Sequence, residues 1–259
     1  LKNNPQIKAA SLGVEKQVKL KKTAFELDNT DFAYTTGQIN SSIIDYQWQI
    51  SQGFKFPTTY LSQSKLQKEK VTLSEHVLAV TQNELIRDVK SAYSQVVYAQ
   101  SVLALMQKLD STYANFANVA KLRYETGETN LLASVAAQGK YQEIVLLKQQ
   151  ADADVQLYNQ HLQRLLNSSQ PIAVGKQPLD KISITLATDT SKLANNPLLA
   201  YYQQLIAVAN QQQKVQQQVF LPNLSAGYFN QQLDGVKGFN GMVFGFTVPI
   251  AFWGKQGKT

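Results

Sequence analysis

The sequence has 259 residues, of which 44% are hydrophobic and 17% charged, and it contains no cysteine. This composition supports a buried core and excludes both a disordered chain and a disulfide-stapled scaffold. The formal net charge of +7 raises the question of nucleic-acid binding. Arginine, however, is limited to Arg87, Arg123 and Arg164, and the lysines are not interleaved with aromatic residues. We therefore expect no nucleic-acid partner.

The start of the sequence and its apolar runs bear on targeting. Because the chain starts at Leu1 with no charged and apolar leader, we expect a processed or excised segment from which any targeting signal has been removed. The longest apolar runs, such as residues 144–147, are far shorter than the ~20 residues of a membrane-spanning helix. We expect no transmembrane helix.

An internal repeat sets the order of the predicted elements. Asn3-Asn4-Pro5 recurs as Asn195-Asn196-Pro197, and Pro57 recurs as Pro249, at the same offset. In chain order, the first repeat (1–192) comprises a helix over 3–26, a strand pair over 31–56, a long helix over 58–122, a hairpin tip over 123–130, a return helix over 131–167 and an equatorial linker over 168–192. A truncated second repeat (193–259) comprises a helix over 195–219 and a strand pair over 223–250, and it stops before a second long hairpin.

The strand pairs are predicted from a period of two in apolar residues. One face carries Tyr46, Trp48, Ile50, Phe54, Phe56, Met242, Phe244, Phe246 and Val248, and partner strands contain Phe32, Tyr34, Leu224, Ala226 and Tyr228. Each run has about the ~9–11 residues that a tilted strand needs to cross a bilayer. On strand evidence alone, an ordinary sheet packed on one side of a soluble core is the simpler interpretation.

The long helices are predicted from the absence of proline between Pro57 and Pro171. Apolar or small residues follow spacings of four and three at Leu85, Val89, Ala92, Val96, Ala99, Leu103, Met106, Leu109, Tyr113, Phe116 and Ala120, which predicts a coiled-coil seam. A second stripe runs through Ile144, Leu147, Ala151, Val155, Tyr158, Leu162 and Leu165. The two helices should pair as an antiparallel hairpin with its tip at Gly127. The first arm would be ~100 Å long, so we expect an elongated molecule.

Candidate groups for chemistry do not converge. His76 and His161 are interpreted as solvated helix histidines, and Asp152 and Asp154 lie two residues apart on a helix, hence on different faces. The sequence offers no nucleophile elbow and no glycine-rich phosphate loop. We expect no enzyme activity, no cofactor and no metal site.

Two lysine clusters flank the first strand pair. One lies within the first 22 residues, and the other comprises Lys65, Lys68 and Lys70. They either solubilise the outside of long helices, or form a basic belt that meets lipid head groups or anionic solutes.

The order of elements resembles the TolC-type outer-membrane efflux proteins, or outer membrane factors. The resemblance is carried by the two Asn-Asn-Pro motifs, by Leu221-Pro222-Asn223-Leu224, by the proline-ended strands and by the tip segment Leu122-Arg123-Tyr124-Glu125-Thr126-Gly127-Glu128-Thr129-Asn130-Leu131-Leu132. It implies a mainly α fold with antiparallel β strands. A long coiled-coil hairpin, the α-barrel element, is joined to amphipathic strand pairs, the β-barrel element.

The resemblance also implies a location and partners. Three copies would form a homotrimer in the bacterial outer membrane, with a periplasmic extension built from the helices. The tips would meet a periplasmic adaptor and an inner-membrane pump of the resistance-nodulation-division class. The docking positions would be Arg123, Tyr124, Thr126, Gly127, Glu128, Thr129 and Asn130, with Gly127 allowing a tight turn that a side chain would hinder.

Two further points follow from the resemblance. Many family members carry Asp where this sequence has Ala133, so an acidic ring at the tip is not expected. The segment Phe54-Lys55-Phe56-Pro57-Thr58 and the glutamine-rich helices are closest to members that serve heavy-metal exporters.

The leading hypothesis is an outer-membrane exit duct of a tripartite efflux system that exports small solutes or metal cations. The alternative is a soluble coiled-coil structural or interaction protein with a small β-sheet. Dependence on detergent would separate the two.

Overall fold

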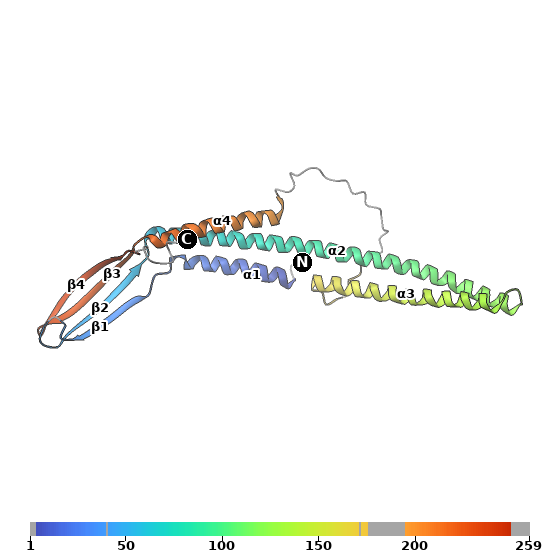
Figure 1. The fold of residues 1–259 in the computed structure, drawn as a ribbon, viewed down its shortest axis with the longest axis horizontal. Helices are drawn as coiled ribbons and strands as arrows, with labels where there is room; N and C mark the ends of the chain where they lie inside the picture. The colour runs from blue at the N-terminus through green and yellow to red at the C-terminus, as the bar shows by residue number, and fades with distance from the viewer. Residues whose placement is uncertain (1–3, 40, 171, 176–194, 250–259) are drawn as a thin grey trace. The chain divides into compact units, whose positions relative to one another are not determined.

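The computed structural model describes residues 4–39, 41–170, 172–175 and 195–249. Over these residues the protein is mainly α-helical with one antiparallel sheet (Figure 1), which confirms the predicted fold class. In chain order the elements are α1 (Pro5–Leu20), the 3-10 helix η1 (Lys21–Phe25), β1 (Thr30–Gly37), β2 (Asp45–Phe54), α2 (Pro57–Glu125), α3 (Leu131–Leu166), α4 (Pro197–Gln217), the 3-10 helix η3 (Gln218–Phe220), β3 (Asn223–Leu233) and β4 (Val236–Thr247). Most of the predicted linker over 168–192 lies outside the described residues.

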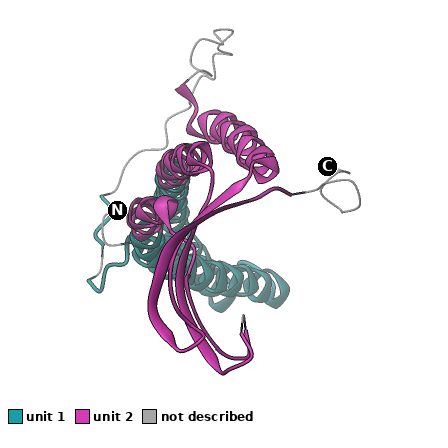
Figure 2. Ribbon diagram, turned by 90° about the vertical axis from the view of Figure 1, so that its left-hand side faces the viewer, with its two compact units in different colours: residues 1–9, 79–192 teal, residues 10–78, 193–259 magenta. Residues whose placement is uncertain are grey.

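The chain forms two compact units, which Figure 2 distinguishes by colour. One contains residues 1–9 and 79–192, and the other contains residues 10–78 and 193–259. Helix α2 continues without a break from one unit into the other. Among the helices that the structure describes, none combines the length and apolar character needed to cross a bilayer.

Residues 79–125 of α2 pack against α3 through a small apolar core. Ala92 and Val96 on α2 and Leu162 on α3 form its centre, with exposures of 2%, 0% and 2%. The partly buried residues around them are Val89, Tyr93, Tyr158, Leu165, Leu166, Ile172 and Val174. Burying one large aliphatic side chain contributes roughly 1.5–3 kcal/mol, so this cluster fixes the pairing of the two helices.

The buried stripe on α2 departs from the predicted seam toward the hairpin tip. Leu85 and Ala92 are buried as predicted, but nearer the tip Ala117 is 3% exposed whereas Phe116 is 56% exposed. A straight α-helix drifts by ~20° per heptad against a strict seven-residue repeat. Over the roughly four heptads from Leu85 to Phe116 the drift approaches the ~100° between consecutive residues, so the contact passes to the next residue.

The recurring Asn-Asn-Pro motif caps two helices in the same way. Asn4 Oδ1 accepts a hydrogen bond from the backbone N–H of Gln6 at 2.8 Å, and Asn196 Oδ1 accepts one from Leu198 at 2.9 Å. The proline that follows occupies the first helical position, where no backbone donor is needed. Asn4, which is 5% exposed, also donates to the carbonyl oxygen of Leu165 at 2.8 Å.

The four strands form one sheet in the order β1-β2-β3-β4, with every pair antiparallel (Figure 1). The central pairing joins β2 to β3, so strands from distant parts of the sequence lie side by side. Asp234 and Gly235 connect β3 to β4 with φ angles of 50° and 78°. Two consecutive positive φ angles are what a two-residue hairpin of type I′ requires, and Asp-Gly supplies them at low cost.

A buried carboxylate ties the two hairpin connections together. Asp45 is 1% exposed and lies at the start of β2. Its Oδ1 accepts the backbone N–H of Asp234 at 3.0 Å, and its Oδ2 accepts the hydroxyl of Ser41 at 2.7 Å. The β1–β2 connection and the β3–β4 turn are therefore held side by side.

Strands β2 and β4 end earlier than the alternation predicts. They stop at Phe54 and Thr247, so Phe56 and Val248 follow the strands instead of lying within them. Residue 250 lies outside the described part of the chain. Pro57 follows the end of β2 by three residues, and Pro249 follows the end of β4 by two. Proline cannot donate to a β ladder, and it also restricts the residue before it.

Candidate functional site

The register of the sheet places large apolar side chains on one face. Ile50, Tyr228 and Met242 lie opposite one another across β2, β3 and β4, and Phe32 continues this row on β1. A second row consists of Phe54, Leu224 and Phe246. Met242, Phe244 and Phe246 on β4 are 73%, 77% and 75% exposed. The chain therefore leaves a broad apolar face uncovered.

The opposite face of the sheet is mostly small or polar. It carries Asp31, Ala33, Thr35, Gln47, Gln49, Ser51, Gly53, Ser225, Gly227, Gln231, Gly241 and Gly245, together with Phe229, Phe239 and Val243. A Cβ atom at Gly227 would lie 3.0 Å from the carbonyl oxygen of Ile50, and one at Gly241 would lie 2.8 Å from the ring of Phe229. A side chain at either position would therefore need a neighbour to shift: the backbone of β2 at Gly227, and the ring of Phe229 at Gly241.

Seven of the nine residues predicted to face a membrane lie within the strands and share one face. They are Tyr46, Trp48, Ile50, Phe54, Met242, Phe244 and Phe246. Trp48 contacts Tyr228, with ring centroids 5.6 Å apart. The alternation did not reveal that Asn230 and Asn240 occupy the same face beside Trp48. The apolar face thus becomes polar toward the hairpin turns.

The seven predicted docking positions lie in the last turn of α2 and in the connection from α2 to α3. Arg123 and Tyr124 are in the last turn of α2, and residues 126–129 form the turn. Asn130 caps α3 by accepting the backbone N–H of Ala133 at 2.9 Å. The tip thus brings together the residues that the sequence motif placed side by side.

Backbone contacts to a single carbonyl hold the tip turn. The carbonyl oxygen of Arg123 accepts the N–H groups of Glu128 and Thr129 at 2.8 and 3.2 Å, and the hydroxyl of Thr126 at 3.2 Å. These contacts satisfy a carbonyl that the helix end would otherwise leave unpaired. The side chains of Arg123 and Glu128 form an exposed ion pair at 3.3 Å.

Gly127 is required by its backbone conformation and not by lack of space. Its φ angle is 77°, and an added Cβ would meet no atom within 4 Å. A side chain would therefore hinder the turn through its backbone conformation and not through a clash with neighbouring atoms. A residue with a Cβ would be strained by the left-handed conformation itself, at a cost of about 1–2 kcal/mol.

Exposed apolar side chains surround the polar turn residues at the tip. Leu122, Tyr124, Leu131, Leu132 and Val135 are 60%, 41%, 56%, 76% and 57% exposed. The predicted docking set included only Tyr124 from this group. For Leu131 and Leu132 the sequence does hold a signal, because they directly follow the helix cap at Asn130. A helix start that faces only water would carry polar residues there.

Comparison with solved structures gives the same fold over almost the whole chain. The outer membrane channel CmeC of Campylobacter jejuni superimposes with a TM-score of 0.79 and 14% identity, covering 99% of this chain and 61% of CmeC. CusC, described with respect to transmembrane channel formation, superimposes with a TM-score of 0.76 and 17% identity, covering 100% of this chain and 65% of CusC. The open state of the MtrE outer membrane channel of Neisseria gonorrhoeae superimposes with a TM-score of 0.70 and 16% identity, covering 99% of this chain and 63% of MtrE. This chain has the TolC-type outer-membrane channel fold.

The TolC-type fold is recognised here from structure and not from sequence comparison. No protein-family model matches the sequence, and no curated protein sequence matches it. The chain spans roughly three fifths to two thirds of the length of the channels that it matches. The matched structures are channels and not enzymes.

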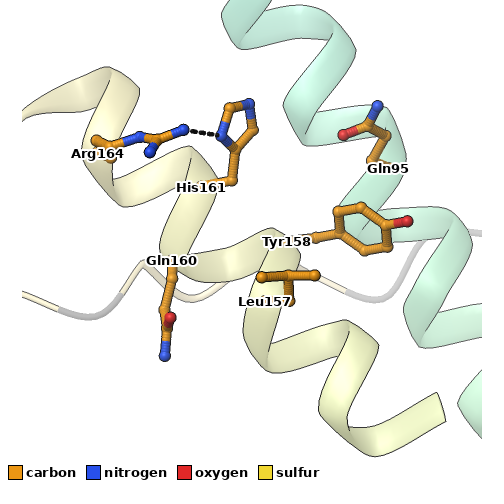
Figure 3. Close-up of a pocket in the computed structure, with 6 residues that line it drawn as sticks. All are labelled: Gln95, Leu157, Tyr158, Gln160, His161 and Arg164. Atoms are coloured by element: carbon orange, nitrogen blue, oxygen red, sulfur yellow. Dashed lines mark hydrogen bonds between the residues drawn. The ribbon is translucent and has the colours of Figure 1, made fainter. Parts of the chain in front are cut away.

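In this TolC-type fold a cavity beside α2 and α3 offers little chemistry. It has a volume of about 440 Å³ and is lined by Gln95, Leu157, Tyr158, Gln160, His161 and Arg164. Figure 3 shows Tyr158 directed toward α2 and Gln160 directed away from it. His161 is partly buried, and its Nδ1 lies 2.9 Å from Nη2 of Arg164. The six lining residues include no carboxylate and no nucleophile.

One ion pair links α2 to α3 in the TolC-type hairpin. Lys148 Nζ lies 2.7 Å from Asp110 Oδ2, and both side chains are partly buried. The hydrogen bond that Lys148 donates to Asp110 raises the pKa of Lys148 above its usual value. Within the described residues, no group of three or more His, Cys, Asp or Glu side chains is placed to hold a metal ion.

Proposed function

We propose that this chain is part of an outer-membrane channel that serves as the exit duct of a tripartite efflux system. The observation that carries the proposal is the sheet, whose exposed apolar face opposes a small and polar face. A sheet with these two faces is suited to separate lipid from water. The proposed location is the bacterial outer membrane with a periplasmic extension.

The dimensions of the apolar face support a position in the bilayer. From Tyr46 to Phe54, the apolar residues at the two ends of β2, the chain advances ~27 Å along the strand direction. At a tilt of ~35–45° this corresponds to a height of about 19–22 Å, most of the ~25 Å apolar band of outer-membrane strands. Tyr34, Tyr46 and Trp48 lie toward the hairpin turns, where aromatic residues are typical of the membrane–water interface.

The free edges of the sheet support assembly with further copies. β1 and β4 are the outermost strands, and each leaves a row of backbone groups without a strand partner within the described chain. Such edges pair readily with another chain. In the proposed homotrimer the sheets of neighbouring copies continue one another. The small and polar face then lines the water-filled path.

The proposed cargo is a small solute or a metal cation. Transport through such a duct depends on its width and its polar wall, so the chain itself needs no reactive group. The heavy-metal assignment rests on the Phe54-Lys55-Phe56-Pro57-Thr58 segment, and the proposed partners are a periplasmic adaptor and an inner-membrane pump of the resistance-nodulation-division class.

The two faces can be tested by thiol labelling, because the sequence contains no cysteine. Val243 and Phe244 are neighbours on β4 with side chains on opposite faces. In membranes, we expect Val243→Cys to react with a charged, water-soluble thiol reagent and Phe244→Cys to be at least tenfold slower, because lipid excludes a charged reagent.

The same two variants in detergent-solubilised, denatured protein provide the control, since both thiols should then react equally. If Phe244→Cys reacts as fast as Val243→Cys in membranes, the duct proposal is wrong. A chain that is also monodisperse without detergent would then support the soluble coiled-coil alternative.

The tip can be tested by charge reversal. Arg123→Glu should weaken crosslinking to the periplasmic adaptor about fivefold, as expected for an exposed charge pair worth ~1 kcal/mol. The backbone contacts to the Arg123 carbonyl oxygen do not depend on its side chain, so folding should be unchanged. Crosslinking yield is measured against adaptor concentration.

Arg87 is the matched control for Arg123, because it also lies exposed on α2 and forms an ion pair, with Asp88 at 2.9 Å. Arg87→Glu should leave adaptor crosslinking unchanged. Equal effects of the two reversals would show that the tip is not the docking site.

A further inference from the structure

We propose that five lysines beside the sheet form a collar that binds the phosphate groups of anionic phospholipids. The lysine collar consists of Lys21, Lys22, Lys65, Lys68 and Lys214. All five side chains are exposed, and they come from η1, α2 and α4 within one compact unit. The proposal rests on the outer-membrane location proposed above, and it assigns the collar to lipid and not to the transported solute.

Contacts between α2 and α4 place Lys214 near the start of α2. The Thr58 hydroxyl donates to the side-chain oxygen of Gln218 at 2.7 Å, and the Gln211 amide donates to the carbonyl oxygen of Ser62 at 3.2 Å. The two helices are therefore antiparallel, and Lys214 lies between these two contacts. Measured along the axis of α2, Lys214 therefore lies level with the first turns of that helix.

Contacts between η1 and α2 place Lys21 and Lys22 at the height of Lys65. The ring of Phe25 stacks on that of Tyr60, with centroids 6.0 Å apart. A cavity of about 280 Å³ brings together residues from η1, α2 and α4, among them Thr23, Ala24, Gln63, Leu66, Gln67 and Val215. Each of these segments carries a collar lysine directly beside its lining residues. Three separate passages of the chain thus present lysine at similar heights.

Exposed apolar residues lie between the lysine collar and the strands on all three passages. They are Phe25 and Leu27 before β1, Leu61 on α2, and Val219 and Phe220 before β3, with exposures of 61%, 55%, 58%, 40% and 47%. On α2, spacings of four and three put Leu61, Lys65 and Lys68 on one helix face. Beyond the Lys55–Asp28 ion pair at the strand ends, each passage carries an exposed apolar residue on the sheet side of its collar lysine. This is the order of the hydrocarbon and phosphate layers in a membrane.

Of the carboxylates near the lysine collar, Glu26 lines the same cavity as Thr23 and Gln63, whereas Glu69 and Asp28 interact with other groups. Glu69 accepts a hydrogen bond from Gln204 at 2.6 Å, and Asp28 pairs with Lys55 at 3.7 Å. Within the described chain, the ammonium groups of the collar form no ion pair. Unpaired positive charge is therefore concentrated beside the apolar band.

The distance from the strands also fits the phosphate layer. Lys65 lies eight residues after the start of α2, or ~12 Å along the helix axis. The polar layer on each side of a bilayer is about 5–7 Å thick, and the flexible lysine stem can reach back toward it. An ammonium group at this height can meet a phosphate while the helix remains in water.

The test compares two triple variants by flotation with vesicles of phosphatidylcholine, with and without phosphatidylglycerol. The collar variant is Lys21→Gln, Lys65→Gln and Lys68→Gln. The control variant removes the same charge from exposed lysines of the other unit: Lys90→Gln, Lys108→Gln and Lys121→Gln. Because each lysine near an anionic surface contributes about fivefold, the collar variant should lose ~100-fold of its preference for phosphatidylglycerol.

The outcomes separate this proposal from the outer-membrane proposal. If wild-type protein binds neither kind of vesicle, the outer-membrane location itself fails. If wild-type protein binds both but the two variants retain equal preference for phosphatidylglycerol, the lysine collar does not bind lipid. A collar variant with altered ion selectivity of the channel and unaltered lipid preference would instead place the lysines on the solute path, and would overturn the assignment.

Discussion

Replacing Phe244 with arginine is expected to destabilise the membrane-inserted protein by about 2–4 kcal/mol, or roughly 30- to 1000-fold in the folding equilibrium. Phe244 lies between Met242 and Phe246 in the apolar face, is 77% exposed, and is paired with Ala226. A charge at this depth would have to leave water for hydrocarbon. Denaturant unfolding of protein in lipid vesicles measures the change.

Val243→Arg is the matched control, because it places the same charge one residue away on the other face of β4. Val243 is 41% exposed and shares its face with small and polar residues. Its replacement should cost at most about 1 kcal/mol. In a soluble protein both residues would face water, so two small and equal effects would contradict a membrane location for the apolar face.

The sequence predicts which side chains share a face of the sheet, but it does not predict what lies against that face. A period of two assigns Trp48 and Ile50 to one face in any strand, whatever lies against that face. The same alternation suits a soluble sheet and a membrane sheet. The structure adds that Phe244 and Phe246 are exposed, so no part of the described chain covers this face as a soluble core would.

The sequence predicts where the hairpin tip lies, but it predicts only part of what holds the turn together. Gly127 interrupts a long helical pattern, and Asn130 has the residue type of a helix cap, so both are visible in the sequence. The role of the Arg123 carbonyl oxygen depends on backbone geometry that side-chain identity does not encode. The space around Gly127 is likewise a property of the folded turn.

The apolar pattern predicts the buried residues of α2 correctly near the base of the helical hairpin, but it is off by one residue near the tip. The rule of four and three assigns Leu85 and Ala92 correctly, but it treats the helix as if it followed a seven-residue repeat throughout its length. Accumulated drift moves the contact from Phe116 to Ala117. Single-residue accuracy over such a length requires the real twist of the pair, which the apolar pattern alone does not supply.

Leu162→Ala is expected to destabilise the α2–α3 hairpin by about 3 kcal/mol. Leu162 is 2% exposed and packs against Ala92 and Val96 on α2. Both of these residues are small or β-branched and cannot extend to fill the vacated space, so the cost includes a cavity as well as lost apolar burial. Thermal and denaturant unfolding, followed by circular dichroism, would measure it. Leu146→Ala on the same helix is the control, because Leu146 is 66% exposed and should cost below about 1 kcal/mol.

The size of the Leu162 effect depends on its contact with Val96, and a double variant tests that contact. If the two side chains pack together, Val96→Ala should destabilise the hairpin by itself, and the double variant should lose less than the sum of the single losses. The second truncation then removes contacts that the first has already broken. Strictly additive losses would mean that the two side chains do not pack together. A Leu162→Ala variant as stable as Leu146→Ala would contradict the burial of Leu162 and the pairing of α2 with α3.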